Sequence, residues 1–235
     1  MTRRLVSIAM TGLLGAGALL ALGSSLKGGD GGYPSALWTA IISTCGPISG
    51  DRQEVILHPG LLAHLEINMP AKVHYEPGDE TKFLIRGEQG LLNQLRVERG
   101  TLSLNCNPGW PVTPLEINVS GPPIPGWTLN GSTELTMVNV QQSRLKLDIQ
   151  GSGNATVTGE VDNVDLNLSG TGKVSLKQLS TKAVVIHVRG NGDVQARAED
   201  SADVSIYGSG RVELFGSPVL RSSDIRGNGR IIQMR

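Results

Sequence analysis

Few side chains in this sequence are of the types that carry out chemistry, and their spacing does not gather them into a known site. None of the four histidines lies at a metal-ligand spacing from a cysteine or another histidine. The histidines are His58, His64, His74 and His187. We interpret them as solvated or hydrogen-bonded side chains, and we predict no catalytic residue, no metal and no cofactor.

A second candidate is a set of mostly charged residues that recurs at a fixed place beside Gly-x-Gly units. Each lies three positions after the first residue of a unit, and we call the set the charged row. It consists of Glu134, Asn154, Lys173, Asp193, Arg211 and Arg230. Polysaccharide-cleaving sites need clustered carboxylates, or a base beside cations, so the row is a candidate for such a site. The alternative is a solvated ladder of ion pairs, each of which contributes little.

The Gly-x-Gly units themselves resemble two ligand-binding motifs, but the fit is poor for both. Calcium-binding β-rolls have a period of about nine residues with an aspartate in every turn, whereas only Asp193 occupies that position here. Dinucleotide-binding loops need a helix after the glycines, and no helical periodicity follows any unit. The glycines are therefore predicted to be structural.

The regular return of these glycines is the strongest structural signal in the chain. Successive units begin 19, 20, 18 and 19 residues apart (170−151, 190−170, 208−190 and 227−208). A fixed period of this size is typical of a solenoid, in which one small unit stacks on the next. A degenerate sixth copy begins at Gly131. The corner glycines are Gly151, Gly153, Gly170, Gly172, Gly190, Gly192, Gly208, Gly210, Gly227 and Gly229.

Around each unit every second residue is apolar, which is the pattern of a strand with one buried face. The column two positions before the unit reads Leu129, Ile149, Leu168, Val188, Ile206 and Ile225. One such coil cannot bury its own apolar face. We therefore predict an all-β fold in which coils of about nineteen residues stack as a parallel β-helix, roughly 4.8 Å apart. An antiparallel sandwich or a β-propeller fits less well, because propeller blades need about forty residues.

Each coil is predicted to contain a strand, a glycine corner, a second strand and a polar return. A glycine on each side of the small middle residue permits backbone angles that a side chain would forbid. Returns such as 161–163 (Val-Asp-Asn) and 199–201 (Glu-Asp-Ser) would then close the coil.

The beginning of the chain has the pattern of an export signal. Arg3 and Arg4 precede a mostly apolar run over 5–22, so we predict a cleaved signal peptide over 1–25 and a flexible linker over 26–44. The alternative is an uncleaved membrane anchor, because the apolar run is just long enough to span a bilayer. We expect an exported protein, in the periplasm or at the cell surface, which would contact the membrane only through this segment and only if the segment stays uncleaved.

The two cysteines, Cys45 and Cys106, leave several states open. An exported chain meets an oxidising compartment, where the two could form a disulfide. They could instead be buried free thiols, and the four residues 42–45 are a weak match to a lipoprotein attachment box. Two solitary cysteines do not make a zinc site, which needs four ligands.

The amino-terminal half is also β-rich, but its period is irregular. Alternating segments that indicate strands lie at 65–68, 72–76, 83–86, 94–98, 101–104 and 115–119. We place this block at 45–120 and the β-helix repeats at 121–235. The block is either a set of early irregular coils or a layer that caps the first coil, since a solenoid end otherwise exposes strand edges.

The order of these parts resembles a known family. The segment 94–104 (QLRVERGTLSL) follows a strand block with a turn at 77–79, and repeats such as 166–176 (LNLSGTGKVSL) come after it. This order resembles the GIN-domain family of exported bacterial proteins, labelled auto-transporter adhesin head domains, over residues 50–232. The resemblance implies a right-handed β-helix-like fold outside the cytoplasm, and it supplies no catalytic residues.

These observations favour binding over catalysis. The formal charge is zero, with 21 basic and 21 acidic residues, and no basic run or nucleic-acid-binding motif occurs, so we predict no nucleic-acid partner. We expect a non-catalytic exported β-helix that presents a rigid surface to an envelope glycan or protein. Two alternatives stay open: a polysaccharide-cleaving enzyme that uses the charged row, and an envelope scaffold that self-associates through the carboxy-terminal coil, at the edge after Ile231 and Ile232.

Overall fold

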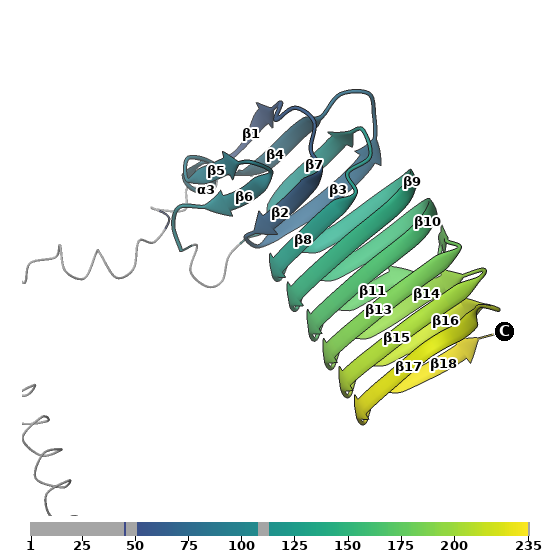
Figure 1. The fold of residues 1–235 in the computed structure, drawn as a ribbon. Helices are drawn as coiled ribbons and strands as arrows, with labels where there is room; N and C mark the ends of the chain where they lie inside the picture. The colour runs from purple at the N-terminus through teal and green to yellow at the C-terminus, as the bar shows by residue number, and fades with distance from the viewer. Residues whose placement is uncertain (1–44, 46–50, 108–112, 235) are drawn as a thin grey trace, which may run out of the picture. The chain divides into compact units, whose positions relative to one another are not determined.

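The computed structural model describes Cys45 and residues 51–107 and 113–234, and these are almost entirely β-strand (Figure 1). The described residues include one short helix, α3 (Gln89–Leu92). The predicted signal peptide (1–25) and linker (26–44) lie outside the described residues, so both remain predictions.

The strands of the repeats pair in parallel with strands one coil away, as the period predicts. These strands are β8 (Gly126–Gly131), β9 (Glu134–Gly151), β10 (Asn154–Gly170), β11 (Lys173–Leu176), β12 (Leu179–Ser180), β13 (Ala183–Gly190), β14 (Asp193–Ala198), β15 (Ser201–Gly208), β16 (Arg211–Gly216), β17 (Val219–Gly227) and β18 (Arg230–Met234). Leu168 pairs with Val188, which pairs with Ile206, and all three side chains are fully buried. The predicted aliphatic column therefore exists, and the parallel β-helix is confirmed.

The amino-terminal block mixes parallel and antiparallel pairing. Its strands are β1 (Arg52–Leu57), β2 (His64–Asn68), β3 (Ala71–Pro77), β4 (Lys82–Glu88), β5 (Leu95–Glu98), β6 (Thr101–Leu104) and β7 (Leu115–Gly121). β2 and β3 pair in parallel with β8 and β9, so they act as an early coil. β4 pairs antiparallel with both β1 and β7, and β5 pairs antiparallel with β6. The block thus contains an early coil, and its other strands extend the pairing beyond β2 and β3. The predicted capping role remains a prediction.

The strands form two sheets, which share the long strands β9 and β10. Sheet I runs β5-β6-β2-β8, then through the second halves of β9 and β10, to β13-β15-β17. Sheet II runs β1-β4-β7-β3, then through the first halves of β9 and β10, to β11-β14-β16-β18. In Figure 1 the strands from β9 to β18 stack in two layers that follow these two sheets. Alternate residues of each sheet point into a continuous aliphatic core.

The first glycine of each unit makes the corner between sheet I and sheet II. Gly190 has a φ of 113°, and a Cβ there would lie 2.6 Å from the carbonyl oxygen of Gly170 in the coil before it. Both the backbone angle and the close stacking therefore require glycine. The second glycine differs, because Gly210 needs no positive φ; a Cβ there would lie 2.7 Å from a Val188 methyl. The predicted role, to permit unusual backbone angles, thus applies to the first glycine of each unit. The second glycine is needed because a side chain there would collide with its neighbours.

The opposite corner is only partly the polar return that the sequence predicts. The segment 199–201 does fall where β14 gives way to β15. Residues 161–163, however, lie inside β10, and Val161 is fully buried. The chain turns there earlier, at a β-bulge where Gly159 has a φ of 125°, so β10 passes from sheet II to sheet I without a break.

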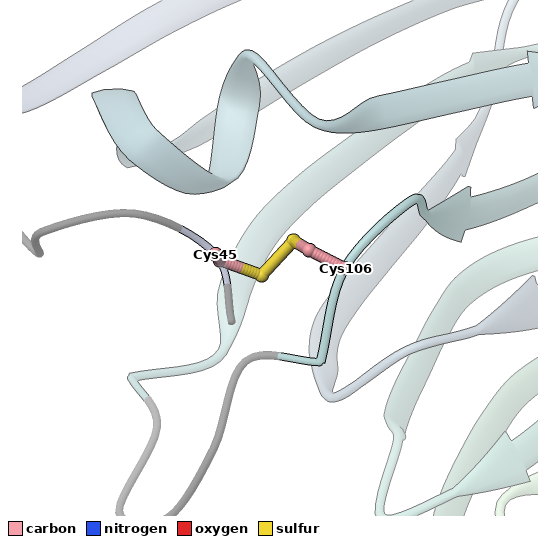
Figure 2. Close-up of a disulfide and its surroundings, with 2 residues drawn as sticks. All are labelled: Cys45 and Cys106. Carbon is pink, nitrogen blue, oxygen red and sulfur yellow. A yellow bond between two sulfur atoms is a disulfide. The ribbon is translucent and has the colours of Figure 1, made fainter. Parts of the chain in front are cut away.

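A disulfide joins Cys45 to Cys106 (Figure 2), with the two Cα atoms 5.0 Å apart. The backbone N–H of Cys45 also donates to the carbonyl oxygen of Asn107, at 3.2 Å. Of the states that the sequence left open, the structure therefore has the disulfide. This crosslink fixes the start of the block to the end of the β5–β6 hairpin.

Candidate functional site

The charged row lies on the outward face of sheet II, because its residues alternate with the buried column of that sheet. Lys173 pairs in register with Asp193, Asp193 with Arg211, and Arg211 with Arg230. Glu134 and Asn154 continue the row toward the block. The structure therefore brings all six predicted residues of the row together, one from each successive strand.

The charged row does not form a ladder of ion pairs, which was the alternative to a polysaccharide-cleaving site. Within the described part of the chain, the side chains of Lys173, Asp193, Arg211 and Arg230 have no opposite charge within 4.0 Å. The contact between Lys173 and its neighbour in the row is through the backbone: the Lys173 N–H donates to the Asn154 side-chain oxygen at 2.9 Å. The charges of the row are therefore open to solvent and to a ligand.

A shallow trough of about 400 Å³ runs over this part of sheet II. Its outward-facing side chains are Asn154, Thr156, Lys173, Ser175, Asp193, Gln195, Arg211 and Glu213. The lining combines short side chains, at Thr156 and Ser175, with longer charged ones. Gln195 donates to Glu213 at 2.8 Å, which orients that carboxylate. The trough thus offers both cations and hydrogen-bond acceptors to a polar ligand.

Two further cations stand beside the trough on the same sheet. Arg197 donates through Nε to the carbonyl oxygen of Lys177, at 3.2 Å. The Lys177 Nζ lies 4.6 Å from the centre of the Phe215 ring, within cation–π range. Neither cation has a carboxylate partner among the described ion pairs.

Sequence reasoning missed how far the row continues into the block. Across β3, β7, β4 and β1 the same row adds Lys72, Glu116, Arg86 and Glu54, so that its charge alternates in sign along the sheet. Two of these carboxylates form ion pairs: Glu54 lies 2.6 Å from Arg86, and Glu116 lies 3.1 Å from Arg52, which is outside the row. Lys72 has no ion pair among the described residues. Parallel pairing of β3 with β9 and β7, followed by antiparallel pairing of β4 with β7 and β1, creates this extension, and the repeat period carries no signal of it.

The four histidines remain apart. His58 is exposed in a loop, and His64 contacts the Thr128 hydroxyl at 3.1 Å on sheet I. His74 contacts Glu76 at 2.9 Å on sheet II, whereas His187 lies on sheet I. Within the described residues, no three histidine, cysteine or carboxylate side chains lie close enough to hold a metal ion.

The aromatic side chains offer the trough little stacking surface. Trp127 is fully buried against Tyr75, with ring centres 5.4 Å apart, and its indole N–H donates to the Ile124 carbonyl oxygen. Tyr207 is partly exposed but lies on sheet I, with Arg226 over its ring. Phe215 is the aromatic residue beside the trough, and Lys177 covers one face of its ring.

The fold and this surface define a class of protein: a parallel β-solenoid with an exposed polar face on one of its sheets. The chain belongs to the family described as "Putative auto-transporter adhesin, head GIN domain", whose sequence profile matches residues 62–218. The predicted family resemblance is therefore confirmed.

Solved structures share this fold. One, described as a putative adhesin from Bacteroides fragilis, has a TM-score of 0.58 and 19% sequence identity, over 80% of this chain and 99% of that chain. Another, a putative adhesin from Parabacteroides merdae, has a TM-score of 0.50 and 14% identity, over 80% of this chain and 98% of that chain. No curated protein sequence matches the chain. In the part of the chain that the structure describes, no helix has the length and apolar character needed to cross a bilayer.

Proposed function

We propose that the chain is an exported, non-catalytic adhesin-type protein that binds a component of the cell envelope through the trough on sheet II. The observation that carries this proposal is the set of unpaired charges on the trough, at Lys173, Asp193 and Arg211. Membership of a family described as adhesins also supports it. A rigid stacked sheet favours binding, because little conformational entropy is lost when a ligand meets a preformed surface.

The proposal is tested with labelled protein and isolated envelope fractions. A trough variant carries Lys173→Gln and Arg211→Gln, which line the trough, and Arg230→Gln at the next position of the charged row. A control variant removes three cations from the outward face of sheet I, through Arg144→Gln, Lys146→Gln and Arg189→Gln, so that both variants lose the same charge. We expect the trough variant to lose binding and the control to keep it. Equal binding by all three proteins would contradict the proposal.

The non-catalytic part of the proposal has its own test. The protein is incubated with a panel of polysaccharides, with and without calcium, and released reducing ends are measured. We expect no release. Release that disappears in an Asp193→Asn or Glu213→Gln variant would support the enzyme alternative instead. The compartment is tested separately, by fractionating cells and treating intact cells with protease.

A second candidate function, self-association, is favoured by the last coil. Among the described strands, none pairs with the outer edges of β17 and β18. Three apolar side chains there are well exposed: Val219 at 66%, Ile225 at 42% and Met234 at 42%. Open strand edges with apolar side chains can pair with a second copy. Sedimentation at increasing concentration tests this candidate, and a strictly monomeric profile would exclude it.

A further inference from the structure

The charge on the carboxy-terminal part of sheet II differs from that of the whole chain. The outward side chains of β11, β14, β16 and β18, with Lys177, include five cations and two carboxylates, which gives +3 (5 − 2), whereas the chain has a formal charge of zero. The cations are Lys173, Lys177, Arg197, Arg211 and Arg230. Because none has a carboxylate partner within the described region, this surface is complementary to an anionic ligand.

The rest of the trough indicates that the anion also carries hydroxyl groups. Asp193 and Glu213 accept hydrogen bonds, and the hydroxyls of Thr156 and Ser175 both donate and accept them. A simple anion would be repelled by the two carboxylates. A sugar polymer would not be, because its hydroxyls can donate to Asp193 and Glu213 while its acid groups meet the cations.

The shape and composition of the trough exclude the other common polyanions. Single-stranded nucleic acid is held by aromatic side chains on which its bases stack, and the trough is lined by none. A membrane surface is broad and flat, whereas the trough is a local hollow of about 400 Å³. A linear chain that lies across the strands fits this geometry better.

The order of charges along the row also limits where the acid groups of the ligand lie. Neighbouring strands are about 4.8 Å apart, so Lys173 and Arg211, two strands apart, are separated by roughly 10 Å, with the carboxylate of Asp193 between them. Among the residues that line the trough, this order favours acid groups on alternate sugars and disfavours an acid on every sugar, because Asp193 would then face a like charge. Arg230, which follows Arg211 in the row, lies outside the trough lining.

We infer that the trough binds an acidic linear glycan whose acid groups lie on alternate sugars, with Lys173 and Arg211 as contacts to the acids and Asp193 as the residue that selects their spacing. This inference rests on the proposed binding function of the trough.

Three soluble glycans test the inference as probes in a direct binding measurement. Hyaluronan carries a carboxylate on every second sugar, polygalacturonate carries one on every sugar, and dextran is neutral. We expect hyaluronan to bind best and dextran not to bind. Raising the salt concentration from about 10 mM to about 1 M shortens the screening length from about 30 Å to about 3 Å and should abolish binding.

Variants of the full-length protein assign the effect to particular residues. The trough variant should raise the Kd for hyaluronan about tenfold, as expected for the loss of two exposed charge contacts, at Lys173 and Arg211, together with the nearby charge of Arg230. The sheet I control variant should bind as the wild type does. Asp193→Asn should strengthen binding of polygalacturonate more than that of hyaluronan. Thermal unfolding of each variant checks that it is folded, and all substituted side chains are at the surface.

The outcomes separate this inference from the proposed function. Loss of envelope binding in the trough variant, together with equal affinity for dextran and hyaluronan, would overturn the glycan class and leave the function standing. Equal binding of hyaluronan and polygalacturonate, unchanged by Asp193→Asn, would overturn the spacing argument. An absence of both envelope and glycan binding would overturn the function and the inference together.

Discussion

The same row of outward residues on sheet II has different partners in the two regions of the molecule. In the amino-terminal block, Arg86 faces Glu54 in register and the two form an ion pair at 2.6 Å. In the repeats, Asp193 faces Arg211 in register, yet no ion pair forms. Opposite charges on facing strands are therefore insufficient evidence of an ion-pair ladder. Two ion pairs join strands of the block at this row, whereas the charges of the row in the repeats have no ion-pair partner among the described residues.

The two regions also differ in how their strands are held. In the repeats each coil repeats the contacts of the coil before it, through corner hydrogen bonds such as Asn191 N–H to the Gly170 carbonyl oxygen, at 2.9 Å. The block has no such period, and it combines antiparallel strands with the Cys45–Cys106 disulfide. Stability in a stacked array depends on nearest neighbours, so we expect damage to the block and damage to the repeats to be separable.

The largest effect should follow from removing the disulfide, by Cys45→Ser together with Cys106→Ser. The crosslink joins positions 61 residues apart, and restricting a loop of that length in the unfolded chain stabilises by about 4 kcal/mol in the chain-entropy account. Hydrogen exchange measured peptide by peptide should show lost protection in β5 and β6 and little change in β14 and β16. An equal loss in both regions would show that block and repeats unfold as one.

The next largest effect should come from a corner of the repeats. Gly190→Ala adds a methyl group 2.6 Å from the Gly170 carbonyl oxygen, at a φ of 113°, and should destabilise by about 3 kcal/mol in denaturant unfolding. Gly131→Ala is the matched control, because Gly131 also has a positive φ, of 86°, but a Cβ there meets nothing within 4 Å. It should cost only about 1 kcal/mol. Equal losses of stability in the two variants would mean that the close contact with the neighbouring coil adds nothing to the backbone strain.

A smaller effect is expected where the block meets the repeats, at Tyr75. Its buried hydroxyl contacts the carbonyl oxygens of Gly121 and Pro122, both at 3.2 Å, so Tyr75→Phe should cost about 1 kcal/mol at neutral pH. Burial raises the pKa of the Tyr75 phenol. The neutral form is therefore favoured in the folded state, and its stabilising effect is complete below a pH of about 10 and is lost as the pH rises through the folded-state pKa.

Denaturant unfolding at rising alkaline pH measures this effect. The wild type should lose its advantage over Tyr75→Phe as the phenol ionises. If the difference between the two proteins stayed constant into strong alkali, the hydroxyl would not be the group responsible.

The sequence predicts the repeats well because each residue contacts the equivalent residue one repeat away. Leu168, Val188 and Ile206 are placed above one another by counting residues alone, and so is the charged row. The block resists this reasoning, since nothing local pairs Glu54 with Arg86 or joins β2 to β8. Sequence reasoning also missed the corner at Gly159, which is a bulge within a continuous strand. Its paired residues in the neighbouring coils are Val140 and Leu179, so no column of glycines marks the corner.

Part of the candidate site was predictable because the charged row also follows the repeat period. The period gives the order of charges in the row, but the absence of ion pairs depends on side-chain positions that no count of residues supplies. The second line of trough residues, such as Ser175 and Gln195, follows the same period two residues further on, so a search at that spacing would have found it.

Two arginines of the charged row, Arg86 and Arg211, should respond differently to the same substitution. Arg86→Gln removes one partner of an exposed ion pair and should cost about 0.5 kcal/mol of stability, whereas Arg211→Gln removes an unpaired charge and should cost nothing measurable. Envelope binding should show the reverse order, with Arg211→Gln weaker than wild type and Arg86→Gln unchanged. The two substitutions are chemically identical, lie on the same row and differ only in whether the arginine has a partner. A stability loss as large for Arg211→Gln as for Arg86→Gln, or a matching loss of binding, would mean that the row has one role along its whole length.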